Sequence, residues 1–367
     1  MRSPLNRIER YVLGRTMIGI GGALAVISSV ILLIEFVEIS RTVGVRAKEV
    51  TVLDVMGLTL LAAPSVILTL LPFVLLFGSL AAFVSLNRRS ELVAIRAAGV
   101  SAWRFILPAA GAAAAIGLLT VAVLNPAASA LADQEQRLQA NMLQDYLHEG
   151  PKAIWLRQGD GRNQVIIRAR SNIGPGVRLM DVSLFVYAQE DGGTLNFARR
   201  IDAKEARLER NAWRLIDARV AAPGAAAIAF DSMTIPSTLT ASTALIRFSS
   251  PKAVPFWALP GMIGRSEAAG FSATGYRLQF HQLLATPLMF AAMSVLAAAF
   301  SLRLLRLGGL AGFAGAGVAL GFGVFFLNQF CSALGKGDVL PPAVAAWTPP
   351  VLALMAGFTL LIFTEDG

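Results

Sequence analysis

The residues best placed for specific contacts lie in one short charged segment, NRRSELVAIRAAGVSAWR at 87–104, between two long uncharged runs. Ser90 is a favourable helix N-cap, Glu91 would lie at the positive end of a helix dipole, and Gly99 is a favourable helix terminator. These signals predict a short helix over 90–99.

Two interpretations of this helix stay open. Leu92, Ile95 and Val93 would form an apolar stripe that Arg96 interrupts, which suits a helix at a membrane interface. The basic residues of the segment would then be a positive anchor; they are Arg88, Arg89, Arg96 and Arg104. Alternatively, the helix docks into a cytoplasmic ATPase, and Glu91 supplies a negative charge for an arginine of that partner.

Catalytic and cofactor motifs are absent from the sequence. We find no GxxxxGK[ST], GxSxG or HExxH pattern and no paired cysteines. The single cysteine, Cys331, excludes an intrachain disulfide, and His148 and His281 alone cannot form the usual kinds of zinc site. We therefore predict no catalytic residues, no metal site and no cofactor.

The composition identifies the kind of element that must position the charged segment. The chain has 367 residues, of which 55% are hydrophobic and 15% charged, and its mean hydropathy is +0.62. An uncharged run of roughly 20 residues can cross a membrane as a helix. The sequence contains six such runs, at 16–34, 55–87, 105–132, 278–302, 307–335 and 339–364.

The positions of the basic residues predict an orientation. Short loops rich in Lys and Arg stay in the cytoplasm. On one side would lie Arg2, Arg7, Arg10, Arg15, Arg88, Arg89, Arg96, Arg104, Arg303 and Arg306; on the other, Arg41, Arg46, Lys48 and Lys336. Both termini are therefore expected in the cytoplasm. The net charge of +9 is spread over anchoring loops and one insert, so it does not indicate nucleic-acid binding.

The insert at 127–265 separates the spans into two groups of three. After a helical stretch that ends near Gly150, short β-branched and aromatic runs alternate with turn clusters such as GDGRN, NIGPG and QEDGG. This spacing indicates an all-β sandwich, roll or open barrel outside the cytoplasm. The domains are predicted at 1–126, 127–265 and 266–367.

A glycine-rich stretch, GGLAGFAGAGVALGFG, begins the fifth predicted span. Its small residues recur at a spacing that lets two helix backbones approach closely in lipid; they include Gly308, Gly312, Gly317 and Gly321. Packing inside the bundle and a mobile interface with another subunit are both compatible with this pattern.

The order of these features resembles the lipopolysaccharide export permeases LptF and LptG over essentially the whole chain. The resemblance rests on RSELVAIRAAG after the second span, the β insert, and YRLQFHQLLATPLMFAAMSVLAAAFSLR at the fourth span. The segment IWLRQGDGRNQVIIRAR is more similar to LptG members. The resemblance implies six transmembrane helices with an inserted jellyroll-like periplasmic domain, in a multi-pass protein of the Gram-negative inner membrane.

The resemblance also implies partners and a transport role. An LptF-like subunit would pair with this chain through the first and fifth spans, above an LptB-like ATPase dimer that binds ATP and magnesium. Lipopolysaccharide would enter the membrane cavity and leave through an LptC-like bitopic protein to a periplasmic bridge. The ATPase-coupling residues expected here are Arg89, Glu91, Leu92, Ile95 and Arg96.

Contacts to lipopolysaccharide are expected near the outer end of the first span and on the fifth. Arg41, Arg46 and Lys48 are candidates for the anionic headgroup. Family members can carry a lysine where this chain has Glu35 and Glu38, which leaves Arg41 as the favoured contact. Candidates for acyl-chain contacts are Ile31, Phe36, Phe322 and Phe326, and candidates for subunit packing or a gate are Gly312, Gly317 and Gly321.

Two other classes of function remain as alternatives. The chain could be a structural membrane anchor whose β domain docks envelope proteins without moving lipid. An envelope enzyme acting on lipid ranks last, because the sequence shows no nucleophile and base pair.

Overall fold

The computed structural model describes most of the chain in two compact units. The described residues are 7–44, 51–144, 154–159, 163–169, 171–172, 178–189, 195–209, 212–237, 254–268, 272–304 and 310–365. The helical unit comprises Met1–Leu143, Lys252–Leu259 and Thr274–Gly367, and the β unit comprises Gln144–Pro251 and Pro260–Ala273. The boundary before the β unit therefore lies at Gln144 and not at residue 127, because the third span continues as a helix past the apolar run.

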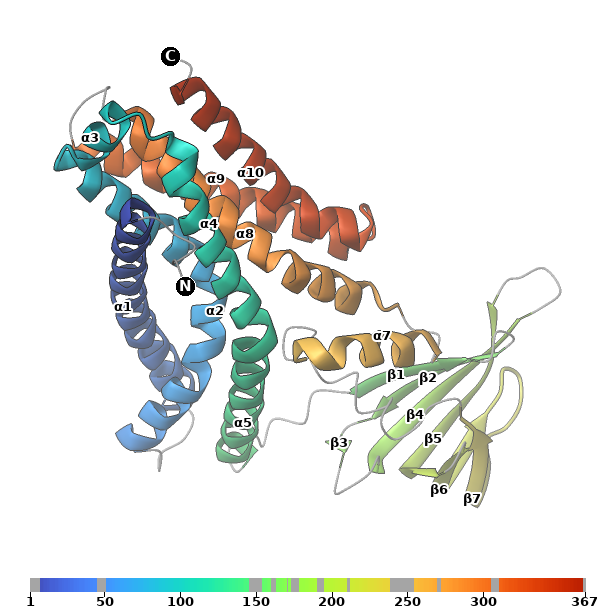
Figure 1. Cartoon of the computed structure of the whole chain (residues 1–367). Coiled ribbons are helices and arrows are strands. Elements are labelled where there is room, and N and C mark those ends of the chain that lie inside the picture. Colours follow the sequence, from blue (N-terminus) through green and yellow to red (C-terminus); the bar gives the residue numbers. More distant parts are fainter. Residues whose placement is uncertain are drawn as a thin grey trace, which may run out of the picture. The chain divides into compact units, whose positions relative to one another are not determined.

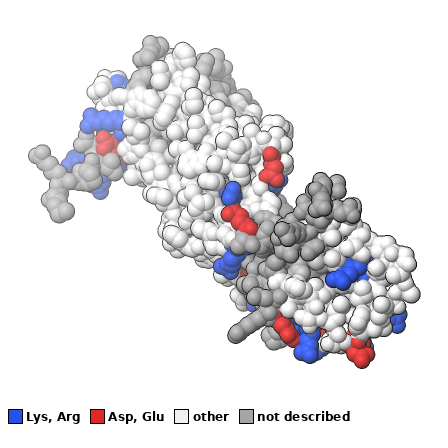
Figure 2. Space-filling model, turned by 90° about the vertical axis from the view of Figure 1, so that its right-hand side faces the viewer, with Lys and Arg blue, Asp and Glu red and all other residues white. Residues whose placement is uncertain are grey.

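The helical unit confirms the predicted six spans. Six described helices are long and apolar enough to cross a membrane. The spans are α1 (Arg7–Gly44), α2 (Val52–Arg88), α4 (Ala102–Leu119) continued by α5 (Asn125–Gln144), α8 (Thr274–Leu304), α9 (Leu310–Lys336) and α10 (Pro342–Glu365), and the unit also contains α3 (Glu91–Ala97) (Figure 1). The short helix α3 joins α2 to α4 and is too short to span a membrane. Figure 2 shows a broad part of the described surface free of charged side chains, as expected for helices in lipid.

The third span is interrupted by a π-helical turn, η1 (Thr120–Leu124), between α4 and α5. Such a turn loosens the helical hydrogen-bond ladder and leaves room for other partners. The carbonyl of Ala122 accepts a 3.0 Å hydrogen bond from the indole of Trp257, and Asn125 Oδ1 accepts one of the same length from the amide of Phe256. The short 3₁₀ helix η3 (Phe256–Ala258) is thereby fixed to the third span, and its Phe256 ring stacks on Phe280 of α8.

The helices approach one another closely where glycines face a neighbour. A Cβ atom at Gly19 of α1 would lie 2.4 Å from the carbonyl oxygen of Gly78 in α2. A Cβ atom at Gly117 of α4 would lie 2.5 Å from the Cα of Pro287 in α8. Backbone contact of this kind maximises dispersion between helices in lipid, where burying apolar surface gives little gain.

The β unit contains one antiparallel sheet, which confirms the predicted all-β class. Its strands are β1 (Ile154–Gly159), β2 (Asn163–Ala169), β3 (Ser171–Asn172), β4 (Arg178–Gln189), β5 (Leu195–Glu209), β6 (Ala212–Ala221) and β7 (Ile228–Pro236). The order is β1-β2-β4-β5-β6-β7, and β3 pairs with β4. One face carries the apolar core, in which Trp213 and Ile167 are fully buried. A helix, α7 (Leu259–Ala268), follows in the chain.

A crease runs across four strands of this sheet. The ladder omits one row of opposed residues, namely Asp181, Lys204, Asp217 and Asp231, yet continues in the same register on either side. Asp181 and Asp217 adopt left-handed backbone angles, with φ of 50° and 52°, which aspartate tolerates better than most residues. Inward-facing Leu179 and Val182 are therefore three positions apart instead of two. The strict alternation expected of a strand is broken here because β4 and β6 each place two successive residues, ending at Asp181 and Asp217, between buried ones.

We expect that adding a single methyl group at Gly117, where α4 crosses α8, destabilises the helical unit. Gly117→Ala should lower the stability of the detergent-solubilised chain by about 1–3 kcal/mol, because the Cβ atom has no space. Gly111→Ala in the same helix meets no atom within 4 Å and should be neutral, or stabilising by up to about 1 kcal/mol through helix propensity. Thermal unfolding measures both variants; equal effects would contradict the close crossing.

Candidate functional site: the charged helix and the open helix faces

The charged helix α3 begins differently from the prediction. It spans Glu91–Ala97, which is shorter than the expected 90–99. Ser90 holds the N-cap position, but with a left-handed φ of 59° and no side-chain capping bond. The expected Ser90 side-chain cap is thus wrong: that cap needs extended backbone at the N-cap residue, and here the chain makes a tight turn out of α2.

The end of α3 matches the prediction at Gly99. With a φ of 77°, Gly99 donates its amide to the carbonyl of Arg96 at 2.9 Å, and the amide of Val100 bonds to the carbonyl of Ile95 at 3.3 Å. This pair of bonds is a Schellman motif, in which glycine supplies the left-handed residue. Val100 and Ile95 also pack against the same apolar cluster, a contact that often accompanies this motif.

The two sides of α3 have different environments. Leu92 is 1% exposed and packs in a cluster built from α1, α2, α4, α8 and α10, while Ile95 lies at its margin. Val93 is 59% exposed, so its predicted place in the apolar stripe is wrong, because it points away from the bundle. The outward side of α3 also carries Ala94 and Ala97. Leu92 therefore anchors the helix, and Val93 is open to a partner.

The predicted coupling residues do not share one side of α3. Glu91 is half-buried and Arg96 half-buried, whereas Arg89, which precedes the helix, is exposed. Leu92 fixes the inner side of the helix to the bundle. Arg89 and Glu91 place charges near the start of the helix, and Arg96 places one near its end.

Polar contacts tie α3 to the start of α1. The hydroxyl of Tyr11 donates to Glu91 Oε2 at 2.8 Å, and Arg15 Nε donates to the Tyr11 oxygen at 3.2 Å. Arg104, at the start of α4, forms a 3.3 Å ion pair with Glu9. Sequence reasoning missed Tyr11 and Glu9, because nothing in a sequence pairs positions 80 or more residues apart.

Several helix ends meet near α3. Asn87 of α2 donates to the carbonyl of Ser301 in α8 at 3.4 Å, and the rings of Trp103 in α4 and Phe358 in α10 lie 5.3 Å apart. With the Tyr11–Glu91 bond, these contacts place the start of α1, the α3 segment and the last turns of α8 and α10 at one end of the bundle. This grouping agrees with the one the basic residues predicted for a single side of the membrane.

Several membrane helices present apolar side chains that no described residue covers, and α1 and α9 are among them. On α9, side chains four positions apart are more than half exposed, namely Val318, Phe322, Phe326 and Phe330. On α1 the exposed residues include Val26, Val30, Leu33 and Val37. The predicted lipid contacts Phe322 and Phe326 are thus accessible. Ile31 is buried, and Phe36 packs partly against Ile39 and Leu58, so neither lines an open face.

Two glycines of α9, Gly317 and Gly321, face α2. Cβ atoms at Gly317 and Gly321 would lie 2.7 and 2.9 Å from Leu80 and Leu76 of α2. Of the two alternatives left open for them, these contacts favour packing inside the bundle: the glycines let α9 approach α2, and the phenylalanine side of α9 is exposed. Gly312 lies in α9, but its surroundings are outside the described side chains, and Gly308 lies outside the described residues.

The predicted headgroup contacts are only partly described. Arg41 is exposed in the last turn of α1, whereas Arg46 and Lys48 lie outside the described residues. Glu38 is exposed and Glu35 half-buried.

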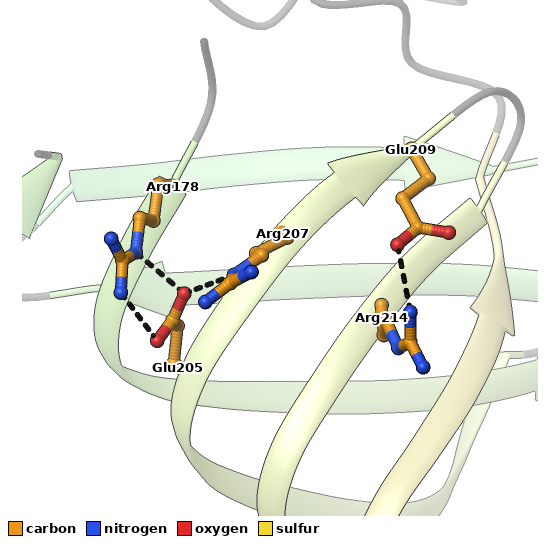
Figure 3. Close-up of polar contacts among 5 residues, drawn as sticks. All are labelled: Arg178, Glu205, Arg207, Glu209 and Arg214. Carbon is orange, nitrogen blue, oxygen red and sulfur yellow. Dashed lines mark hydrogen bonds and ion pairs between the residues drawn. The ribbon is translucent and has the colours of Figure 1, made fainter. Parts of the chain in front are cut away.

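The outer face of the β unit carries a row of arginines that sequence reasoning also missed. Arg178, Arg207 and Arg214 lie opposite one another on β4, β5 and β6. Like charges so placed repel, and Glu205 offsets this by binding both Arg178, at 2.5 and 2.9 Å, and Arg207 (Figure 3). Hydrogen bonds from Arg178 and then Arg207 lower the pKa of Glu205 to about 2. Arg214 pairs with exposed Glu209 at 3.5 Å.

Comparisons with known proteins cover nearly the whole chain. The family described as lipopolysaccharide export system permease LptF/LptG matches residues 10–362. The chain is also 24% identical over 373 residues to lipopolysaccharide export system permease protein LptG of Escherichia coli strain K12, covering 98% of this chain and 99% of that protein. The protein of the same name from Escherichia coli O6:H1 strain CFT073 gives the same values.

We expect Glu205 to make the β unit sensitive to acid. Its pKa falls from an ordinary 4.5 to about 2 on folding, so the stabilisation is complete above pH 4.5 and is lost as the pH drops toward 2. Glu205→Gln should expose β-unit amides at pH 7 and flatten this dependence. Glu209→Gln, which removes an exposed pair, should change little. Hydrogen exchange of the full chain at matched pH tests this; identical exchange in both variants would refute it.

Proposed function

Because the chain belongs to the LptF/LptG family of lipopolysaccharide export permeases, we propose that it is one permease subunit of an ABC-type exporter. In this proposal it extracts lipopolysaccharide from the inner membrane and passes it, through the periplasmic β unit, to an LptC-like protein and a periplasmic bridge. An LptB-like ATPase dimer binds and hydrolyses ATP on the cytoplasmic side, so this chain carries no catalytic residues and no cofactor.

The way α3 packs on the membrane helices is the observation that supports its proposed contact with the ATPase. A helix that receives force from an ATPase needs a firm connection to the membrane helices and a free side for the partner. Leu92 supplies the first, because it is buried among residues of α1, α2, α4, α8 and α10. The exposed side with Val93 supplies the second, and Arg89 and Glu91 place charges at its start. A push on α3 would therefore act on the core at this end of the bundle.

The open faces of α1 and α9 support pairing with an LptF-like subunit around a lipid cavity. Both are apolar over several turns, and α9 contributes phenylalanines that can contact either acyl chains or a neighbouring helix. At the far end of α1 from Tyr11, Arg41 is exposed and suits an anionic lipid headgroup, and Arg46 follows it in the sequence. The cavity would then have apolar walls and a basic outer rim.

Variants at two neighbouring residues of α3 distinguish loss of ATPase binding from loss of folding. Val93→Asp should leave the free energy of unfolding nearly unchanged, but weaken co-purification with the ATPase about tenfold, since it places a charge in the partner interface. Leu92→Asp should instead lower stability by several kcal/mol, because it buries a carboxylate among apolar side chains. If Val93→Asp left ATPase association and ATP-driven lipid release unchanged, α3 would not be the docking helix.

Photo-crosslinking tests the open face of α9. A benzophenone amino acid at Phe322 should form adducts with the partner subunit or with lipopolysaccharide, and the lipopolysaccharide adducts should depend on ATP. The same probe at Phe363 of α10, which is also an exposed phenylalanine on a membrane helix, should react with bulk phospholipid only. Protein adducts without any lipopolysaccharide, at Phe322 and in the β unit, would favour the structural-anchor alternative.

A further inference from the structure

We propose that Tyr11 is a positioning residue for Glu91, and that the series Arg15, Tyr11 and Glu91 carries movement of α3 into the first membrane span. This inference rests on the proposed function, because it assumes that a partner moves α3. It adds to that function an internal connection that ties the charged helix to α1, the helix whose outer face is open.

The three side chains form a directed series of hydrogen bonds. Arg15 Nε donates to the Tyr11 oxygen at 3.2 Å, and the Tyr11 hydroxyl donates to Glu91 Oε2 at 2.8 Å. The Arg15 guanidinium also lies over the Tyr11 ring, 5.5 Å from its centre, which fixes the orientation of the phenol. A cation that donates to a hydroxyl strengthens the bond that the hydroxyl makes to a carboxylate.

Glu91 keeps one carboxylate oxygen for another partner. Tyr11 occupies Oε2, and Oε1 makes no hydrogen bond to any residue in the described part of the chain. A carboxylate accepts at both oxygens. An arginine of the ATPase can therefore bind Oε1 while Tyr11 stays on Oε2, so that one side chain connects the partner to α1. The hydroxyl sets the direction in which Oε1 is presented.

The shape of the α1 contact explains why this connection matters. Near its start, α1 buries a single narrow stripe, Val12, Thr16 and Ile20, at four-residue spacing. A second polar contact of α1, the ion pair between Glu9 and Arg104, involves α4, which follows α3 in the chain. The first turns of α1 are thus bonded to Glu91, just before buried Leu92, and to Arg104, beyond the end of α3. A shift of α3 must therefore displace the start of α1.

A tyrosine at this position also suits a membrane interface without any relay. Tyr11→Phe separates the two roles, because it keeps the aromatic ring and removes only the hydroxyl. Tyr187→Phe is the matched control: it deletes a hydroxyl in the β unit, where Tyr187 packs edge-on against Phe197.

The experiment uses the full permease complex with its ATPase in proteoliposomes that contain lipopolysaccharide. Tyr11→Phe should leave the assembled amount unchanged and reduce lipid released per ATP hydrolysed by roughly fivefold to tenfold, the size expected when one hydrogen bond of ordinary strength is lost. Tyr187→Phe should match the wild type. A ratio for Tyr11→Phe equal to that of the wild type would overturn the proposal.

A second measurement does not depend on transport. In the detergent-solubilised chain, a double-mutant cycle of Tyr11→Phe and Glu91→Gln should show non-additive effects on thermal unfolding, since each variant weakens the same bond. Additive effects would overturn the relay. If the wild-type complex neither bound the ATPase nor released lipid, the proposed function would fail, while a non-additive cycle would still establish the Tyr11–Glu91 bond.

Discussion

The helical unit depends on close contact between helix backbones at glycine positions. In lipid, apolar side chains gain little by leaving the solvent, so helices are held by dispersion at short range and by a few polar contacts. Gly19 against Gly78 and Gly117 against Pro287 provide this contact for the first and third spans. Because α1 is fixed to α2 at the Gly19 crossing, its start can be tied to α3 while most of its outer face stays open.

The α3 segment combines two kinds of attachment with different physical properties. Burial of Leu92 is non-directional and holds the helix to the bundle, whereas the bonds of Tyr11 to Glu91 and of Arg104 to Glu9 are directional and tie the start of α3 and the start of α4 to α1. A loop tied by only one of these could shift without moving the spans. The combination suits a protein whose own sequence has no nucleotide-binding motif and whose family transports lipid.

The β unit is stabilised differently from the helical unit, because its charged outer face is in contact with water. Its apolar residues gather on one side of the sheet, and the crease at Asp181 and Asp217 keeps that side continuous while each strand bends. The arginines Arg178 and Arg207 can lie opposite each other only because Glu205 accepts from both. Its electrostatics therefore respond to pH, whereas the helical unit is governed by packing.

The sequence by itself determined six spans, the all-β insert, the glycine end of α3 and the family, since run length, turn clusters and motif letters are local signals. It did not determine which face of each span is buried. Lipid-facing and core-facing residues are equally apolar, so Gly317 gave no sign that it packs on α2, nor Phe322 that it stays exposed. Only the tertiary structure placed Tyr11 on Glu91 and turned Leu92 inward and Val93 outward, because these depend on contacts between segments distant in the chain.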